Sequence, residues 1–169
     1  MHRNNFHGPK DYLDAAKNPD ATAEQLHDLA QTRWSFVDLA IASHETATPE
    51  TLRHLLAKAD FNAYSGSELL LAIASNPSAP ADVLILVSEH VPELLHKRDR
   101  QNAFAAGVAL SLRQDTPLDA LAELLTHDQV TTEFRKVVAR ETNRPDVLTI
   151  LAADQSERVR NAARRNTNS

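Results

Sequence analysis

The segment that decides the fold is Ala74-Ser75-Asn76-Pro77-Ser78-Ala79-Pro80-Ala81-Asp82-Val83-Leu84. It joins an apolar run that ends in alanine to a second apolar run, through a turn that contains two prolines. A residue that precedes proline is pushed out of the helical region, so Asn76 should end the first helix. Proline at the start of a helix and an acidic residue in its first turn both favour a new helix near Pro80. The segment therefore predicts a helix, a short turn and a second helix.

The same pattern recurs along the chain, and five copies align on apolar residues that share one face of each second helix. The aligned leucines are Leu26, Leu52, Leu84, Leu121 and Leu148, followed three residues later by Leu29, Leu55, Val87, Leu124 and Leu151. Ten residues before each aligned leucine, the first helix carries Ala16, Ala42, Ala74, Ser111 and Val138. Small side chains let two helices approach closely, so the leucines of the partner helix fill the groove between them.

These patterns predict short stacked helices. Helices of roughly 8 to 11 residues do not persist alone in water, so their stability must come from stacking. We expect one all-α domain over residues 1–169, an α-α superhelix (solenoid) of about five to six degenerate repeats.

Successive aligned leucines are 26, 32, 37 and 27 residues apart, which places inserts near residues 60–66 and 89–101. Residues 159–166 repeat residues 134–141, so a terminal half-repeat is expected over residues 156–166.

Residues 74–84, 154–160 and 159–167 resemble the unit of the leucine-rich repeat variant family. That unit reads as a Val-Arg start, an alanine run, Asn-Pro, a Thr-Pro turn, leucines and an Asp-rich end. The resemblance covers most of residues 10–168 and is sharp in the third repeat, the fifth repeat and the tail. It implies a right-handed, HEAT-like superhelix in which α-helices alternate with short 3₁₀ helices. The sequence His44-Glu45-Thr46 in place of Asn-Pro, and the insert before Asn102, leave an ordinary α-α superhelix open.

The composition excludes several classes of function. The chain has no cysteine, so the iron–sulfur centre of the founding family members is not carried over and no cofactor is expected. Its three glycines are too scattered for a phosphate-binding loop. None of its eight histidines lies in a His-Glu-x-x-His pattern, and no nucleophile motif is present. We therefore expect no catalytic residue, no metal site and no enzymatic activity.

The sequence also bears on location. No apolar stretch approaches the roughly 18 residues of a membrane span, and the polar start lacks the apolar segment of a signal peptide. The absence of cysteine fits a reducing compartment. A cytoplasmic protein without a membrane contact is expected.

Two regions are candidate partner-binding sites. Arg33 and Trp34, with Phe36, form the one large aromatic cluster of the sequence, and tryptophan beside arginine is typical of binding hot spots. The alternative is that Trp34 fills a wedge between repeats. The second region is the insert at residues 91–100, because inserts in repeat arrays often lie on the binding face. Its candidate residues are Glu93, His96, Lys97, Arg98 and Arg100.

The C-terminal end is a candidate anion-binding region. Residues 131–169 hold 8 basic and 5 acidic side chains, whereas residues 1–130 hold 10 basic and 18 acidic ones. The candidates are Arg135, Arg140, Arg158, Arg160, Arg164 and Arg165. The alternative is that these arginines form structural ion pairs with Glu133, Asp154 and Glu157.

The preferred hypothesis is a non-enzymatic interaction module that binds a protein partner, because stacked short helices offer an extended surface. The second hypothesis is nucleic-acid binding by the arginine-rich C-terminal half. The formal charge of −5 and the few aromatic residues weigh against that second hypothesis.

Overall fold

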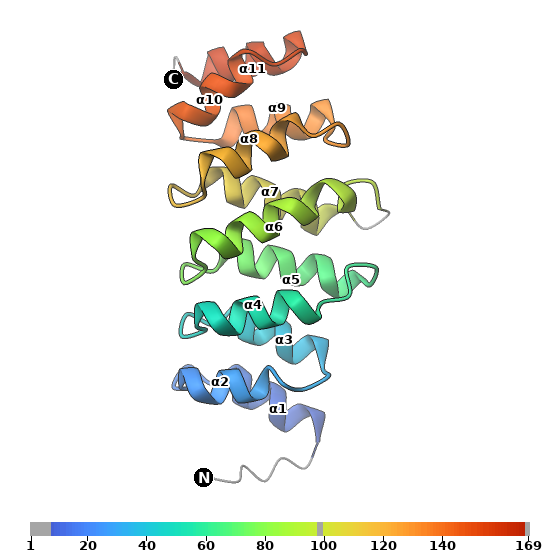
Figure 1. Cartoon of the computed structure of the whole chain (residues 1–169), viewed down its shortest axis with the longest axis vertical. Coiled ribbons are helices and arrows are strands. Elements are labelled where there is room, and N and C mark those ends of the chain that lie inside the picture. The colour runs from blue at the N-terminus through green and yellow to red at the C-terminus, as the bar shows by residue number, and fades with distance from the viewer. Residues whose placement is uncertain (1–7, 98–99, 168–169) are drawn as a thin grey trace. The chain divides into compact units, whose positions relative to one another are not determined.

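The computed structural model describes residues 8–97 and 100–167, which form eleven α-helices and no strand, so the predicted all-α fold is confirmed (Figure 1). The first helices of the repeats are α1 (Pro9–Ala16), α3 (Ser35–Ala42), α5 (Tyr64–Ser75), α7 (Gln101–Leu112), α9 (Thr132–Glu141) and α11 (Glu157–Thr167). The second helices are α2 (Ala23–Leu29), α4 (Pro49–Lys58), α6 (Ala81–Leu94), α8 (Leu118–Thr126) and α10 (Pro145–Ala152).

The second helices are α-helices, so the alternation with 3₁₀ helices implied by the resemblance is wrong for the described residues. Their first turns already close the thirteen-atom ring of an α-helix. Leu26 N donates to Thr22 O at 3.0 Å, and Leu52 N donates to Thr48 O at 3.0 Å. Threonine caps support the first turns of α2 and α4 and of the first helix α9, because Thr22, Thr48 and Thr131 each accept a hydrogen bond from the backbone of that turn.

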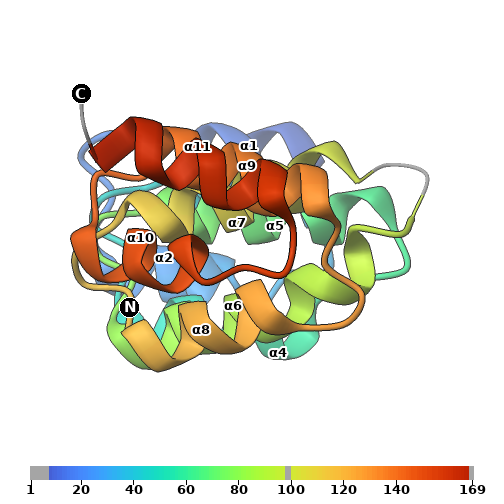
Figure 2. The same cartoon turned by 90° about the horizontal axis from the view of Figure 1, so that it is seen from above.

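The chain divides into two compact units, residues 1–79 and residues 80–169. In the first unit, α3 packs between α1 and α5, and α2 and α4 cover the same helices. In the second unit, α7, α9 and α11 pack in one layer and α6, α8 and α10 in another. Figure 2 shows this second unit with α9 and α11 on one side and α8 on the other.

The core consists of the residues that define the repeat. Every leucine and valine in the two aligned sets of the second helices is buried, and so is every aligned residue of the first helices. One aligned residue, Ser111, is polar. It can be buried at little cost because its hydroxyl donates to Val108 O at 2.7 Å. The pattern of small residues facing leucines therefore predicts the core correctly.

Side chains from one repeat bind the carbonyl groups at the end of the preceding first helix. Asn76 Nδ2 donates to Ala42 O at 2.7 Å and to His44 O at 3.0 Å. Thr142 Oγ1 donates to Ser111 O at 2.7 Å. The last carbonyls of an α-helix lack partners within the helix, so these side chains satisfy them. Asn76 thus ends its own helix, as predicted, and also ties that helix to the previous one.

The two inserts have different structures. Residues 59–63 form the loop before α5, and the Gly66 Cα packs closely against the backbone of that loop. The second insert extends α6 to 14 residues, and Val91, Leu94 and Leu95 are buried. The leucine pair of the second insert is therefore part of the core of its unit. At the C-terminal end, α11 packs against α9 and α10.

Gly107→Ala tests the close packing of α7 against α9. A Cβ atom at residue 107 would lie 2.6 Å from Cζ of the buried Phe134, whose ring packs edge-on against Phe104 at 5.2 Å. Alanine favours a helix over glycine by about 1 kcal/mol, but we expect the clash to prevail and to lower the free energy of unfolding by about 1–2 kcal/mol. Urea denaturation measures this change. The exposed Gln101→Ala in the same helix is the control, and an equal or more stable Gly107→Ala protein would contradict the packing.

Asp146→Asn tests the ion pair at the start of α10. Arg144 is buried and donates to Asp146 Oδ2 at 2.6 Å, which holds the pKa of the Asp146 carboxyl below its usual value. A carboxyl whose pKa is lowered by folding stabilises the folded protein at pH values above its unfolded pKa of about 3.9. This stabilisation is lost as the pH falls through the folded pKa. We expect Asp146→Asn to lower the melting temperature at pH 7 and the difference from wild type to shrink below about pH 4. A difference that is unchanged at acidic pH would show that the charge is irrelevant.

Candidate functional site

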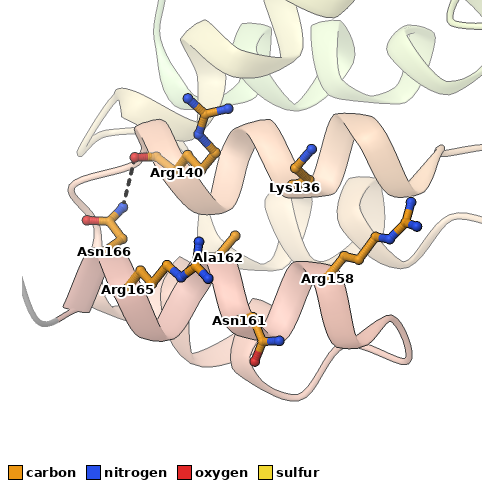
Figure 3. A pocket seen from close by; sticks show the side chains of 7 residues that line it. All are labelled: Lys136, Arg140, Arg158, Asn161, Ala162, Arg165 and Asn166. Atoms are coloured by element: carbon orange, nitrogen blue, oxygen red, sulfur yellow. Dashed lines mark hydrogen bonds between the residues drawn. The ribbon is translucent and has the colours of Figure 1, made fainter.

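A basic groove of about 700 Å³ lies between α9 and α11 in the second unit (Figure 3). Its lining residues are Lys136, Arg140, Arg158, Asn161, Ala162, Arg165 and Asn166. Four of these side chains are cationic, and none is a carboxylate. We refer to these seven residues as the basic groove.

Helical spacing brings the cations together. Lys136 and Arg140 are four residues apart on α9, so they share one face of that helix. Arg158 and Arg165 are seven residues apart on α11, which also places them on one face. Figure 3 shows Arg158 and Arg165 on the side of α11 that faces α9. The repeat therefore generates the groove, because α11 follows α9 in the same register.

Asn166 holds the two helices of the groove together. Its Nδ2 atom donates to Thr142 O at 2.7 Å, to Ala139 O at 3.0 Å and to Arg140 O at 3.2 Å. These acceptors are the last carbonyls of α9, which have no partner within that helix. Asn166 thus fixes the end of α11 against the end of α9, and with it the width of the groove.

The charges of the groove are only partly compensated within the protein. Lys136 Nζ lies 3.2 Å from Oε2 of the exposed Glu133. Arg140 and Arg158 are exposed, and neither forms an ion pair with a residue that the structure describes. Like charges held in one groove repel each other, and an anionic group bound among them would relieve that repulsion. The groove is therefore suited to an anionic ligand.

The structure separates the six predicted arginines. Arg140, Arg158 and Arg165 line the groove. Arg135 is buried instead: its Nε donates to Asp154 Oδ2 at 2.7 Å and its Nη1 to Val130 O at 2.6 Å. Arg160 Nη1 donates to the carbonyls of Asp154 and Gln155 at 2.7 and 3.0 Å. Arg164 is exposed on α11 outside the groove lining. Arg135 and Arg160 thus stabilise loops, as the ion-pair alternative predicted for Arg135 and Asp154.

The aromatic candidates lie in the first unit. The Arg33 guanidinium lies 5.0 Å from the centre of the Trp34 ring, and that ring lies 5.7 Å from Phe36. Trp34 is half-buried at the N-terminal cap of α3, whereas Arg33 is exposed. This contact holds the Arg33 guanidinium over the indole ring.

The candidates in the second insert do not form a joint site. Lys97 Nζ lies 3.4 Å from Glu93 Oε1, and His96 Nε2 lies 2.6 Å from Gln129 O. Arg100 is exposed at the N-terminal cap of α7. Arg98 lies outside the described residues. Glu93 and Lys97 therefore make a local contact at the end of α6, whereas His96 contacts the loop between α8 and α9.

Four residues of the groove were missing from the predicted set: Lys136, Asn161, Ala162 and Asn166. Lys136 could have been included, because its spacing from Arg140 places both on one helix face. Asn166 carries no such signal, since its contacts depend on where the end of α9 lies.

Other kinds of site are not found in the described part of the chain. No group of three or more His, Asp or Glu side chains there is arranged to hold a metal ion. No helix in residues 8–97 or 100–167 has both the length and the apolar character needed to cross a membrane. Comparison of the chain with protein-family models, with curated proteins and with solved structures finds no match.

Arg135→Ala and Arg158→Ala test the separation between structural and groove arginines. Removing Arg135 leaves Asp154 buried without its cation, and the loss of one member of a buried pair costs about 3–5 kcal/mol. Arg158→Ala removes an exposed side chain, so we expect a change within about 0.5 kcal/mol. Urea denaturation of both variants measures the two values. Equal losses of stability would contradict the assignment.

Proposed function

We propose that this chain is a non-enzymatic helical-repeat binding module whose basic groove binds an acidic segment of a protein partner. The observation that carries the proposal is a groove of about 700 Å³ lined by four cationic side chains and no carboxylate. Arginine binds carboxylates through two parallel hydrogen bonds, which gives such a groove geometric selectivity as well as charge. Because the groove is open to solvent, the interaction should be modest in affinity and sensitive to salt.

A short acidic segment fits the groove better than a nucleic acid does, because the cations are confined to two helices. In the repeat register, the positions of Lys136 and Arg140 correspond to Ala109 and Arg113 on α7. Arg113 forms an ion pair with Asp115, whose Oδ2 atom lies 2.6 Å from Arg113 Nη2. This contact lowers the pKa of the Asp115 carboxyl. The row of cations therefore does not continue onto α7, whereas nucleic-acid binding typically uses about 6–10 phosphate contacts.

Two further features favour a protein partner. No aromatic side chain lines the groove, so it offers no surface on which a base could stack. The formal charge of −5 also works against the approach of a long polyanion. A short acidic segment carries fewer negative charges than a long polyanion, so the net negative charge of the protein repels it less, and it can still contact the four cations of the groove.

The proposal includes the architecture around the groove. We take the repeats to be of the ordinary α-α superhelix type, because the second helices are α-helices and the aligned leucines keep the same pattern from α2 to α10. A cytoplasmic location is supported by the absence of cysteine.

Binding of a labelled, Glu-rich peptide tests the proposal by fluorescence polarisation at low and at physiological salt. The test variant is Arg140→Gln with Arg158→Gln, because both side chains are exposed and neither forms an ion pair with a described residue. The control is Arg164→Gln with Arg100→Gln, which removes the same charge outside the groove. We expect the groove variant to bind the peptide about tenfold more weakly and the control to bind within about twofold of wild type.

Two results would contradict the proposal. Equal weakening of the groove variant and the control would mean that only net charge matters. Tighter binding of single-stranded DNA of matched charge than of the peptide, lost in the groove variant, would favour the nucleic-acid hypothesis instead.

A further inference from the structure

A second cavity, of about 390 Å³, lies in the first unit, where the α2–α3 loop meets the ends of α3 and α4 and the start of α5. Its polar lining includes Thr32, Arg33, Asp38, Lys58, Asp60 and Ser65. Two of these side chains are cationic and two are carboxylates, so the lining has no net charge. The volume lies within the range of small-molecule sites, and its chemistry differs from that of the basic groove.

The cavity lies at the C-terminal end of a polar face of α4. Thr51, His54 and Lys58 are at spacings of three and four residues and share one face of α4. Thr51 is fully buried, whereas the corresponding residue is Gln25 in α2 and is apolar in α6, α8 and α10, namely Val83, Ala120 and Val147. The Thr51 hydroxyl is hydrogen-bonded, because its Oγ1 atom lies 2.9 Å from Thr48 Oγ1 and 3.1 Å from His27 Nδ1, and such contacts offset the cost of burying a polar side chain. Of these three residues, Lys58 lines the cavity.

Lys58 and Asp38 form the neutral floor of the cavity. Lys58 Nζ lies 2.6 Å from Asp38 Oδ1 and donates to the carbonyls of Ala30 and Thr32 at 2.5 and 2.8 Å. Lys58 thus forms an ion pair with Asp38 and hydrogen-bonds the carbonyls at the end of α2. The Asp38 side chain is only 13% exposed, and burial raises the pKa of its carboxyl even though Lys58 opposes that shift.

The remaining polar groups of the cavity are available to a ligand. The hydroxyl oxygen of Thr32 is buried and has no hydrogen-bond partner among the residues that the structure describes. Such a buried group usually has a protein, water or ligand partner. Arg33 and Asp60 are exposed and carry opposite charges, and the Arg33 guanidinium is held by its contact with Trp34.

The insert near residues 60–66 builds one wall of this cavity. A Cβ atom at residue 66 would lie 2.8 Å from Phe61 Cα, so α5 packs directly against the backbone of the insert. Asp60 Oδ1 accepts a hydrogen bond from Asn62 N at 2.9 Å, which fixes the turn. The insert therefore has a defined conformation in which Asp60, Ser65 and Gly66 all line the cavity.

We propose that this cavity binds a small zwitterion of the amino-acid class, with its carboxylate on Arg33, its ammonium group on Asp60 and a polar group on the hydroxyl of Thr32. A zwitterion matches a lining that presents one exposed charge of each sign, whereas a singly charged ligand would leave one of them uncompensated. Charge-assisted hydrogen bonds to both ends would select for ligands in which the two charges are present together.

Free amino acids are the probes that test the inference, each supplied singly to the intact protein in a thermal-shift measurement and then in calorimetry. Binding to the folded state alone raises the melting temperature as the concentration exceeds Kd. We expect at least one amino acid to raise it, while its N-acetyl derivative and its methyl ester, each lacking one charge, bind about tenfold more weakly or not at all.

Matched variants connect that binding to the cavity. Arg33→Gln and Asp60→Asn alter exposed residues, so both variants should fold, and each should weaken binding by about tenfold or more. Glu45→Gln removes an exposed charge elsewhere in the first unit and should leave binding unchanged, as should Arg140→Gln with Arg158→Gln in the basic groove. The proposal is overturned if no amino acid binds at millimolar concentration, if the ester or the N-acetyl derivative binds as well as the free amino acid, or if Arg33→Gln and Asp60→Asn bind like wild type.

Discussion

The structure depends on how the carbonyl groups at the ends of short helices are satisfied. A helix of 8 residues, such as α3, leaves about half of its carbonyls without an intrahelical donor. Side chains from elsewhere in the same unit supply the donors: Lys58 for Ala30 and Thr32, Asn76 for Ala42 and His44, and Asn166 for Thr142. Because each donor reaches across from a later element, one repeat completes the helix ends of the repeat before it. Stacking is thus required by hydrogen bonding as well as by apolar burial.

Local signals in the sequence predict the helices and the core, because those features depend on spacing along one chain. The leucines that follow Leu26 at repeat intervals are buried, and Thr22 and Thr48 cap the helices that they precede. The wrong expectation, that 3₁₀ helices alternate with α-helices, came from the family resemblance, whereas the spacing of the leucines is that of one α-helical face.

The candidate sites were less predictable, because a site depends on which side chains meet across repeats. Arg135 and Arg140 are five residues apart and equally basic, yet one is buried against Asp154 and the other lines the groove. Only the position of the α10–α11 loop decides between them. The polar face of α4 could have been found from the sequence by comparing Thr51 with Val83, Ala120 and Val147 in the aligned repeats. The alignment thus already shows that α4 is polar where α6, α8 and α10 are apolar.

The last helix, α11, contributes few side chains to the core. Within α11 only Val159 and Ala163 are buried, both small enough to recur in any repeat, while Arg158 and Arg165 form one side of the groove. Selection can therefore replace the outward residues of α11 without disturbing the fold, provided that Asn166 keeps its bonds to the end of α9. Ligand preference and structural integrity are encoded by separate positions of the same helix, so proteins of this architecture can diverge in what they recognise while they preserve a common framework.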